Sequence, residues 1–197
     1  MFQELEPTIS KQCGSTAVVC LIIGTQLICI NLGDARAVLC RNGKALDLSQ
    51  DYKASRKDEQ ERIKSQGGFI VFGRVLGRLA VTRAFGDFEC KKISILNEQT
   101  QEKEIKNFVL NEPEIRITTI NKLTDDFLIL ASDGLFDRFT SNECISLARE
   151  KFLSMDVMEQ DPLVVANHLV QEVINARINS DNTTVIVVCL NAGIDTL

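Results

Sequence analysis

The 197-residue chain lacks the features that mark membrane, secreted and nucleic-acid-binding proteins. No run of 18 apolar residues is present, and the first seven residues lack the basic and apolar segments of a secretory signal. No Cys-x-x-Cys pair occurs among the seven cysteines, most of which lie in apolar runs where a thiol behaves as a small hydrophobe. The 22 basic residues are outnumbered by 27 acidic ones, so no positive field is available for nucleic acid or an anionic membrane. These absences predict a reduced, intracellular protein, cytoplasmic or nuclear, with neither nucleic acid nor membrane as a partner.

The composition of the chain is that of an ordinary folded domain. Hydrophobic residues make up 45% and charged residues 25%, both close to the averages for soluble proteins. A length of 197 residues is enough for one domain with a real core and short for two. The sequence therefore predicts a single domain over residues 1–197.

The order of apolar runs and turn residues predicts a mixed α and β chain. Residues 16–48 alternate short Val- and Ile-rich runs with tight turns, the pattern of an antiparallel meander in which some strands are covered on both faces. Residues 68–87 are punctuated by glycine and arginine, and residues 90–111 are polar, which indicates a surface excursion. The remaining expected elements are a helix over 56–66 opened by Ser55, strands over 114–120, 127–131 and 184–190, and helices over 140–155 and 162–177.

Four aspartates stand where predicted strands end. Asp133 and Asp137 follow an apolar run in Ser132-Asp133-Gly134-Leu135-Phe136-Asp137, Asp181 precedes the last strand, and Asp51 follows the meander. A cluster of carboxylate oxygens suits a hard divalent cation such as Mg²⁺ or Mn²⁺. Each aspartate has an ordinary alternative, because Asp beside Gly or Asn is a common way to build a turn. Taken from the residues alone, both interpretations stay open.

Collinear motifs across nearly the whole chain resemble the protein phosphatase 2C family. The resemblance implies an α+β fold, a sandwich of two antiparallel β-sheets flanked by helices, with metal ions at one end. The motifs that carry it are Gly14-Ser15-Thr16-Ala17, Gly33-Asp34-Ala35-Arg36, Gln50-Asp51-Tyr52-Lys53, Glu61-Arg62-Ile63 with Gly67-Gly68, Arg74-Val75 with Gly77, Leu79-Ala80-Val81-Thr82-Arg83-Ala84-Phe85-Gly86-Asp87, Glu112-Pro113-Glu114-Ile115, Ser132-Asp133-Gly134-Leu135-Phe136-Asp137 and Asp181-Asn182-Thr183-Thr184.

The resemblance also implies roles for individual residues. Asp133 and Asp181 would be ligands of the catalytic metal pair, Asp133, Asp137 and Asp51 would surround a further metal position, and Gly134 would let the chain turn closely beneath the ions. Residues 68–92 resemble the flap that borders the cleft and influences substrate choice.

Two arginines of the same region are candidate contacts for the substrate phosphate. Arg74 and Arg83 lie in the flap-like segment and in the motif that follows it. The alternative is that Arg74 is a flap residue and Arg83 a structural anchor.

The family pattern is incomplete in this chain. The early Arg and Glu-Asp pair and the Asp-Gly-His-Gly-Gly motif, whose first Asp bridges the two metals, are absent, so the resemblance begins part way into the family's domain. The only histidine, His168, lies in a predicted helix as a surface or packing residue, which leaves no catalytic residue identifiable beyond the metal ligands. A domain truncated in this way would leave sheet edges and an apolar face uncovered. We therefore expect another protein surface to cover them, from a second polypeptide with the N-terminal part, a second copy of this chain, or a larger assembly.

Two functions of different classes follow from the resemblance. The first is a metal-dependent serine/threonine phosphatase, which hydrolyses phosphoserine and phosphothreonine in phosphoproteins with a metal-activated water and needs the absent N-terminal portion for activity. The second is a non-catalytic, phosphatase-like interaction or scaffold module, since the shared metal ligand is lacking. A generic β-rich domain with no site is the third alternative, and activity of this chain on its own is left open.

Overall fold

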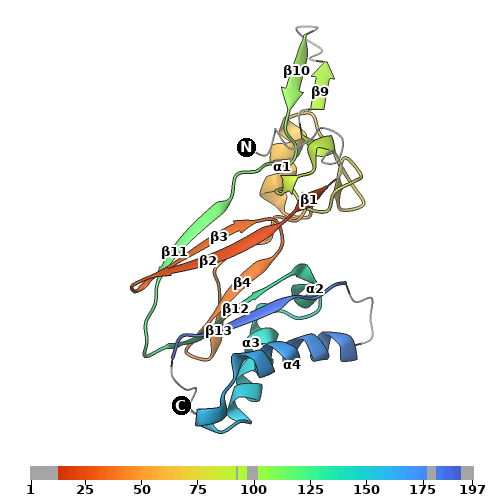
Figure 1. The fold of residues 1–197 in the computed structure, drawn as a ribbon. Helices are drawn as coiled ribbons and strands as arrows, with labels where there is room; N and C mark the ends of the chain where they lie inside the picture. The colour runs from red at the N-terminus through yellow and green to blue at the C-terminus, as the bar shows by residue number, and fades with distance from the viewer. Residues whose placement is uncertain (1–12, 92, 97–101, 177–180, 192–197) are drawn as a thin grey trace. The chain divides into compact units, whose positions relative to one another are not determined.

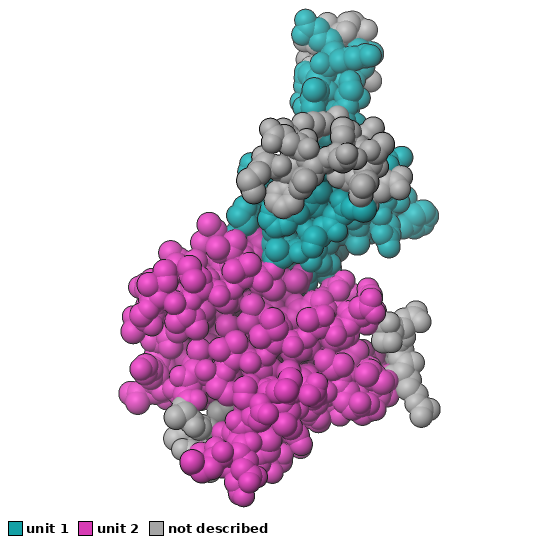
Figure 2. All heavy atoms as spheres, in the orientation of Figure 1, with its two compact units in different colours: residues 1–17, 32–34, 51–114 teal, residues 18–31, 35–50, 115–197 magenta. Residues whose placement is uncertain are grey.

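The computed structural model describes residues 13–91, 93–96, 102–176 and 181–191, and the chain divides into two compact units. Unit 1 comprises residues 1–17, 32–34 and 51–114, and unit 2 comprises residues 18–31, 35–50 and 115–197 (Figure 2). In the described chain no helix combines the length and the apolarity needed to cross a bilayer. All seven cysteines lie in the described ranges and are free thiols.

Unit 2 is built on two antiparallel sheets. The larger sheet has the order β13-β12-β4-β5, formed by Val185–Cys189, Asp125–Ala131, Arg36–Arg41 and Lys44–Asp47. The smaller sheet has the order β11-β3-β2, formed by Glu114–Thr119, Gln26–Leu32 and Ala17–Ile23.

The core of unit 2 lies on both faces of the larger sheet. Side chains alternate between the faces of a strand, so Leu39 of β4 packs with Leu27 and Cys29 of β3, while Val38 points to the other side. On that other side α3 (Ser141–Leu153) and α4 (Pro162–Asn175) cover the sheet (Figure 1). The resulting order of layers, sheet on sheet on helices, confirms the predicted α+β fold with a sandwich of two antiparallel sheets.

Local sequence signals explain where the helices of unit 2 begin. Thr140 caps α3 in a reciprocal box with Glu143, in which each side chain bonds the backbone N–H of the other residue. Asp161 accepts a hydrogen bond from the Leu163 N–H at 2.8 Å, and Pro162 fills the first turn of α4. Both starts agree with prediction. Two short helices complete the unit, α2 (Asp133–Phe136) and η2 (Val157–Glu159).

Unit 1 is formed by one helix and several short hairpins. Its elements are α1 (Lys57–Ser65), β1 (Gly14–Ser15) with β8 (Phe85–Gly86), β6 (Ile70–Val71) with β7 (Arg74–Val75), β9 (Ile93–Leu96) with β10 (Lys103–Lys106), and η1 (Phe88–Cys90). Ile63 of α1 packs in a separate core with Val75, Val81 and Phe108.

Two predictions for unit 1 are corrected by the structure. Ser55 does not cap α1, because the N-cap position is Arg56 and no side chain bonds there. The polar segment 90–111 is not all surface, since Phe108 and Val109 are buried. A Cβ on Gly68 would stand 2.6 Å from the Phe108 ring, so the glycine makes the space in which that ring is buried.

The smaller sheet of unit 2 keeps one apolar face in solvent. Exposed apolar residues lie on β2 at Val19, Leu21, Ile22 and Ile23 and on β11 at Ile115 and Ile117, and all of these except Ile22 follow an alternation along their strand. An alternation of this kind places side chains on one face of a strand. The predicted uncovered apolar face is therefore present, as a band of β-branched and leucine side chains.

The buried aromatic pair beneath the larger sheet predicts where unit 2 is most sensitive to truncation. Phe152 of α3 is fully buried with its ring centre 5.2 Å from that of Phe127. Phe152→Ala is expected to lower the free energy of unfolding by about 3–5 kcal/mol, because it leaves a cavity. Leu153→Ala, at the neighbouring position with 39% of its side chain exposed, is the matched control and should cost less than about 1 kcal/mol. Urea denaturation followed by circular dichroism measures both, and equal losses would contradict the assigned helix face.

Candidate functional site

The end of the β12–β13 pair brings two of the predicted motifs together. Ala131 lies opposite Val185, and the ladder continues with a hydrogen bond from the Ser132 N–H to the Thr184 carbonyl at 3.1 Å. The Ser132 hydroxyl closes the same end, since it accepts from the Thr184 N–H at 3.1 Å and donates to the Asn182 carbonyl at 3.3 Å. The antiparallel register thus places the start of α2 beside the segment that carries Asp181.

The short helix α2 sets the spacing of Asp133 and Asp137. Its turn is closed by a hydrogen bond from the Asp137 N–H to the Asp133 carbonyl at 2.7 Å. Residues four apart in a helix lie on one face, so the two carboxylates share a side of α2. Asp133 is half-buried and Asp137 is exposed.

Gly134 determines how closely α2 approaches the segment before β13. A Cβ at this position would stand 2.6 Å from the Thr183 hydroxyl oxygen and 2.7 Å from the Asn182 carbonyl oxygen. Real side chains do not fit at such distances, so a glycine is needed for this contact. Asp181 itself is exposed, and its carboxylate accepts a hydrogen bond from the Asn182 N–H at 2.7 Å.

The donor set can be compared with the needs of a divalent cation. Asp133, Asp137 and Asp181 supply oxygen ligands of the kind that Mg²⁺ and Mn²⁺ prefer, and all three belong to unit 2. In the ranges that the structure describes, no three Asp, Glu, His or Cys side chains converge as a metal-holding group. The carboxylates therefore fit the cation in chemistry but are not a complete ligand set, and their metal role stays a prediction.

Asp51 belongs to unit 1, as do Tyr52 and Lys53 of the same motif, whereas Gln50 belongs to unit 2. It is half-buried, and the backbone next to it is fixed by a hydrogen bond from the Tyr52 N–H to the Gly33 carbonyl at 2.9 Å. Its predicted part in a further metal position is untested.

Arg36 is a residue of the site region to which the sequence assigned no role. It lies opposite Ala131 on β4, its guanidinium carbon is 4.5 Å from the centre of the Phe136 ring, and it donates to the Ser141 hydroxyl at 3.0 Å. One cation thereby contacts both α2 and the start of α3. The sequence did contain a motif that could have pointed to this residue, Gly33-Asp34-Ala35-Arg36. The motif supported the family resemblance, but no function was assigned to its arginine.

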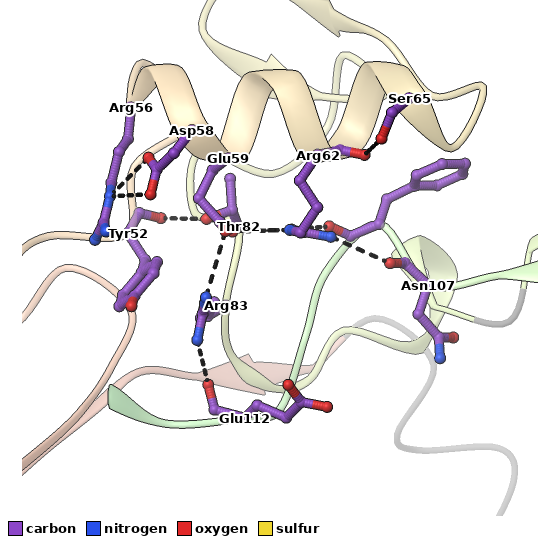
Figure 3. Close-up of polar contacts among 11 residues, drawn as sticks. Tyr52, Arg56, Asp58, Glu59, Arg62, Ser65, Thr82, Arg83, Asn107 and Glu112 are labelled. Atoms are coloured by element: carbon purple, nitrogen blue, oxygen red, sulfur yellow. Dashed lines mark hydrogen bonds and ion pairs between the residues drawn. The ribbon is translucent and has the colours of Figure 1, made fainter. Parts of the chain in front are cut away.

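Arg83 is held by several groups in unit 1. Its guanidinium donates to the Glu112 carbonyl at 2.9 Å, lies 3.4 Å from the Glu59 carboxylate, and stacks 3.9 Å from the centre of the Tyr52 ring (Figure 3). The Glu59 carboxylate also accepts hydrogen bonds from Nη2 and Nε of Arg62, at 2.8 and 3.1 Å. These contacts are those of an anchor between α1 and the chain near Glu112, and the predicted phosphate contact of Arg83 remains untested.

Arg74 lies exposed on β7 and donates to the Arg78 carbonyl at 2.8 Å. Its predicted phosphate contact is likewise untested. His168 lies on α4 with its Nδ1 4.0 Å from the Glu172 carboxylate, in a surface position of the kind expected for it.

Solved structures with a similar fold support the architecture. The chain superposes with a TM-score of 0.73 on a C. elegans sex determining protein, at 27% identity over 90% of this chain and 40% of that one. It superposes with a TM-score of 0.69 on the serine-threonine phosphatase 2C of Toxoplasma gondii, at 19% identity over 91% of this chain and 59% of that one. The second likeness shows the fold alone.

Sequence comparison gives the family. The profile described as Protein phosphatase 2C matches residues 3–183, and the chain belongs to this family of metal-dependent phosphatases. Probable protein phosphatase 2C 43 of Arabidopsis thaliana is 36% identical over 96% of this chain and 42% of its own length. Probable protein phosphatase 2C 45 of Oryza sativa subsp. japonica is 40% identical over 90% of this chain and 55% of its own length. The chain thus spans about half the length of these relatives.

The buried carboxylate of Glu59 predicts how the stability of unit 1 depends on pH. Burial alone would raise the pKa of Glu59, but hydrogen bonds from Arg62 and Thr82 and the charges of Arg62 and Arg83 outweigh it and lower the pKa below its usual value. A lowered pKa in the folded state stabilises the fold above the unfolded pKa of about 4.3, and this contribution is lost as pH falls through the folded value.

Glu59→Gln is therefore expected to lower the free energy of unfolding at pH 7 by about 1–3 kcal/mol, with a difference from the natural chain that shrinks as pH falls below about 4. Urea denaturation at a series of pH values measures the difference. Glu61→Gln, on the exposed side of the same helix, is the control and should change little at any pH. A difference for Glu59→Gln that stays constant down to pH 3 would contradict the assigned ion pairs.

Proposed function

We propose that this chain supplies the C-terminal part of a metal-dependent protein serine/threonine phosphatase, which removes phosphate from phosphoserine and phosphothreonine. The observation that supports the proposal is that the pairing of β12 with β13 brings the segments that carry Asp133, Asp137 and Asp181 to one end of unit 2, each within a motif of the protein phosphatase 2C family. Since the chain spans about half of its relatives, catalysis is expected to require further residues of the domain.

The proposed cofactor is Mg²⁺ or Mn²⁺, held by Asp133, Asp137 and Asp181 of unit 2. When bound in such a site, the cation supplies a water of lowered pKa and neutralises charge on phosphoryl oxygens. The residues of this chain orient the ligands: Gly134 admits the close approach of α2, and Ser132 ties it to the segment at Asn182.

The exposed apolar face of β2 and β11 supports a protein partner. Val19, Leu21, Ile23, Ile115 and Ile117 are exposed apolar side chains of one sheet, and exposed apolar patches mark protein interfaces. A polypeptide with the remaining part of the phosphatase domain is the proposed cover, and a second copy of this chain is the alternative.

A second function is favoured by a different observation. Because no three metal-binding side chains converge in the part of the chain that the structure describes, the protein can instead act as a non-catalytic, phosphatase-like interaction module. The two proposals differ in what they predict for metal binding and for activity.

Metal binding by the chain alone is expected to be weak. Titration with Mn²⁺ in a calorimeter should give a dissociation constant weaker than about 0.1 mM, because the ligand set is incomplete. Asp133→Asn should abolish the binding heat. Asp156→Asn, an exposed aspartate outside the candidate site, should leave it unchanged. Tight binding of two ions by the unaltered chain would show that the ligand set is complete without further residues.

Activity is tested by completing the domain. The chain is mixed with the N-terminal part of the Oryza relative that it does not contain, and phosphate release from a phosphothreonine peptide is measured with Mn²⁺. Under the first proposal the mixture is active, and Asp133→Asn or Asp181→Asn lowers the rate by at least about 100-fold, since mutation of the outer-shell partners of a metal site already costs about 10- to 100-fold. Formation of a stable complex with no phosphate release would favour the interaction module.

A further inference from the structure

Two of the cysteines lie on neighbouring strands of the smaller sheet in unit 2. Cys20 belongs to β2 and Cys29 to β3, and these strands are hydrogen-bonded neighbours in the order β11-β3-β2. The residues between the two strands, Gly24 and Thr25, form a tight turn in which Gly24 has a φ of 60°. A hairpin with such a short loop has a defined register, because the residues that flank the loop are paired with each other.

This register sets Cys20 directly opposite Cys29. Ile23 and Gln26 flank the loop and face each other, and the same count along each strand away from the loop leads to the two cysteines. Pairs that exchange backbone hydrogen bonds alternate with pairs that do not, and the cysteine pair is of the second kind. Opposed Cα atoms in such pairs are about 4.5 Å apart, within the range of about 4.4–6.8 Å that a disulfide spans.

The side chains of both cysteines point to the same side of the sheet. Cys29 is buried in a core with Leu27 of its own strand and Leu39 of the larger sheet, and Cys20 is half-buried and packs against this core. The Cys20 thiol donates a hydrogen bond to the Cys29 sulfur, and this bond together with burial raises the pKa of Cys20. The two sulfur atoms therefore face each other in the folded chain.

A metal ion does not account for this pair of thiols. A structural zinc site takes four ligands, of which two sulfurs supply only half. Among the residues that the structure describes, no third Cys, His, Asp or Glu side chain joins them in a metal-holding group. A disulfide, in contrast, needs only the two sulfurs that are present.

We infer that Cys20 and Cys29 are a site of reversible disulfide formation by exchange with a small-molecule disulfide such as oxidised glutathione. The deprotonated sulfur of half-buried Cys20 attacks one sulfur of the small disulfide, whose S–S bond breaks, and the first small thiol leaves with the proton that Cys20 lost. The Cys29 sulfur then attacks the Cys20 sulfur of this mixed disulfide and displaces the second small thiol, which takes the proton of Cys29. The two cysteines are oxidised, and the small disulfide is reduced to two thiols.

The bond ties the edge strand of the smaller sheet to its neighbour. β2 is the last strand in the order β11-β3-β2, and its outward side chains Val19, Leu21 and Ile23 belong to the exposed apolar face. A disulfide restricts the unfolded chain and so favours the folded pairing of β2 with β3. Oxidation is therefore expected to hold this part of the apolar face in place.

Differential alkylation of the full chain tests the site. The folded chain is incubated with oxidised glutathione, free thiols are blocked with one reagent, and the remaining cysteines are reduced and labelled with a second one. The tryptic peptide of residues 12–36 contains Cys13, Cys20 and Cys29, so its fragmentation in a mass spectrometer reports each position. The second label is expected on Cys20 and Cys29 together, about tenfold more often than on any other two cysteines. Before reduction the intact mass should be lower by two hydrogen atoms, without bound glutathione.

Variants separate the register of the sheet from proximity in the sequence. Cys29→Val keeps the strand apolar and removes one sulfur, so it should abolish the internal linkage. Cys13→Ser removes an exposed cysteine of the same peptide and should leave the linkage unchanged. In concentrated urea the preference for Cys20 with Cys29 should disappear, because Cys13 is about as close to Cys20 along the chain as Cys29 is.

Thermal unfolding followed by circular dichroism is the second measurement. The linked chain should melt about 5 °C above the reduced chain, and a thiol reductant should remove the difference. Linkage of Cys13 in place of either cysteine, or no linkage at any excess of oxidised glutathione, would overturn the inference. A preference that persists in urea would also contradict it, since the register would then not be its cause. Neither measurement involves the candidate metal ligands, so both are independent of the proposed function.

Discussion

The antiparallel pairing of β12 with β13 is the interaction on which the candidate site depends. One strand leads into Asp133 and the other emerges from Asp181, and the register that sets Ala131 opposite Val185 decides that these two points of the chain are neighbours. A shift by one residue would turn the core residues of β12 to the wrong face, so the burial of Phe127 and Ile129 fixes the register. The apolar core thereby positions carboxylates that are not themselves part of it.

Much of this arrangement could be predicted from local patterns. The buried strands were visible as Val- and Ile-rich runs, and the helix starts at Thr140 and Asp161 follow from capping chemistry within three residues of each cap. The four aspartates were selected because they lie next to predicted strands, and the shared metal role that the family resemblance implies for them stays a prediction. In these cases the residues that determine the structure are close together in the sequence, or they recur with the period of the strand or helix.

What could not be predicted depends on contacts between distant parts of the chain. Phe108 lies in a polar stretch, and it is buried only because Gly68 leaves space for its ring. Ser55 has the right chemistry for a cap, but Arg56 occupies the cap position and bonds Asp58, with its guanidinium over the Tyr52 ring. The part played by Arg36 was hidden for the same reason, since its partners Phe136 and Ser141 are brought to it by the sheet. The predicted metal role of the aspartates stays open, because ligand convergence requires side-chain positions that no sequence pattern contains.

The contact beneath Gly134 means that the candidate site can be lost without losing any ligand. A side chain there would press on Thr183 and Asn182 and move α2 away from the segment that carries Asp181. Every carboxylate and the net charge would remain as they are, yet the distance between the two acidic motifs would change. The spacing of the site thus depends on the absence of a side-chain methyl group at residue 134. A natural variant at this position would change the geometry of the site although every candidate ligand is still present.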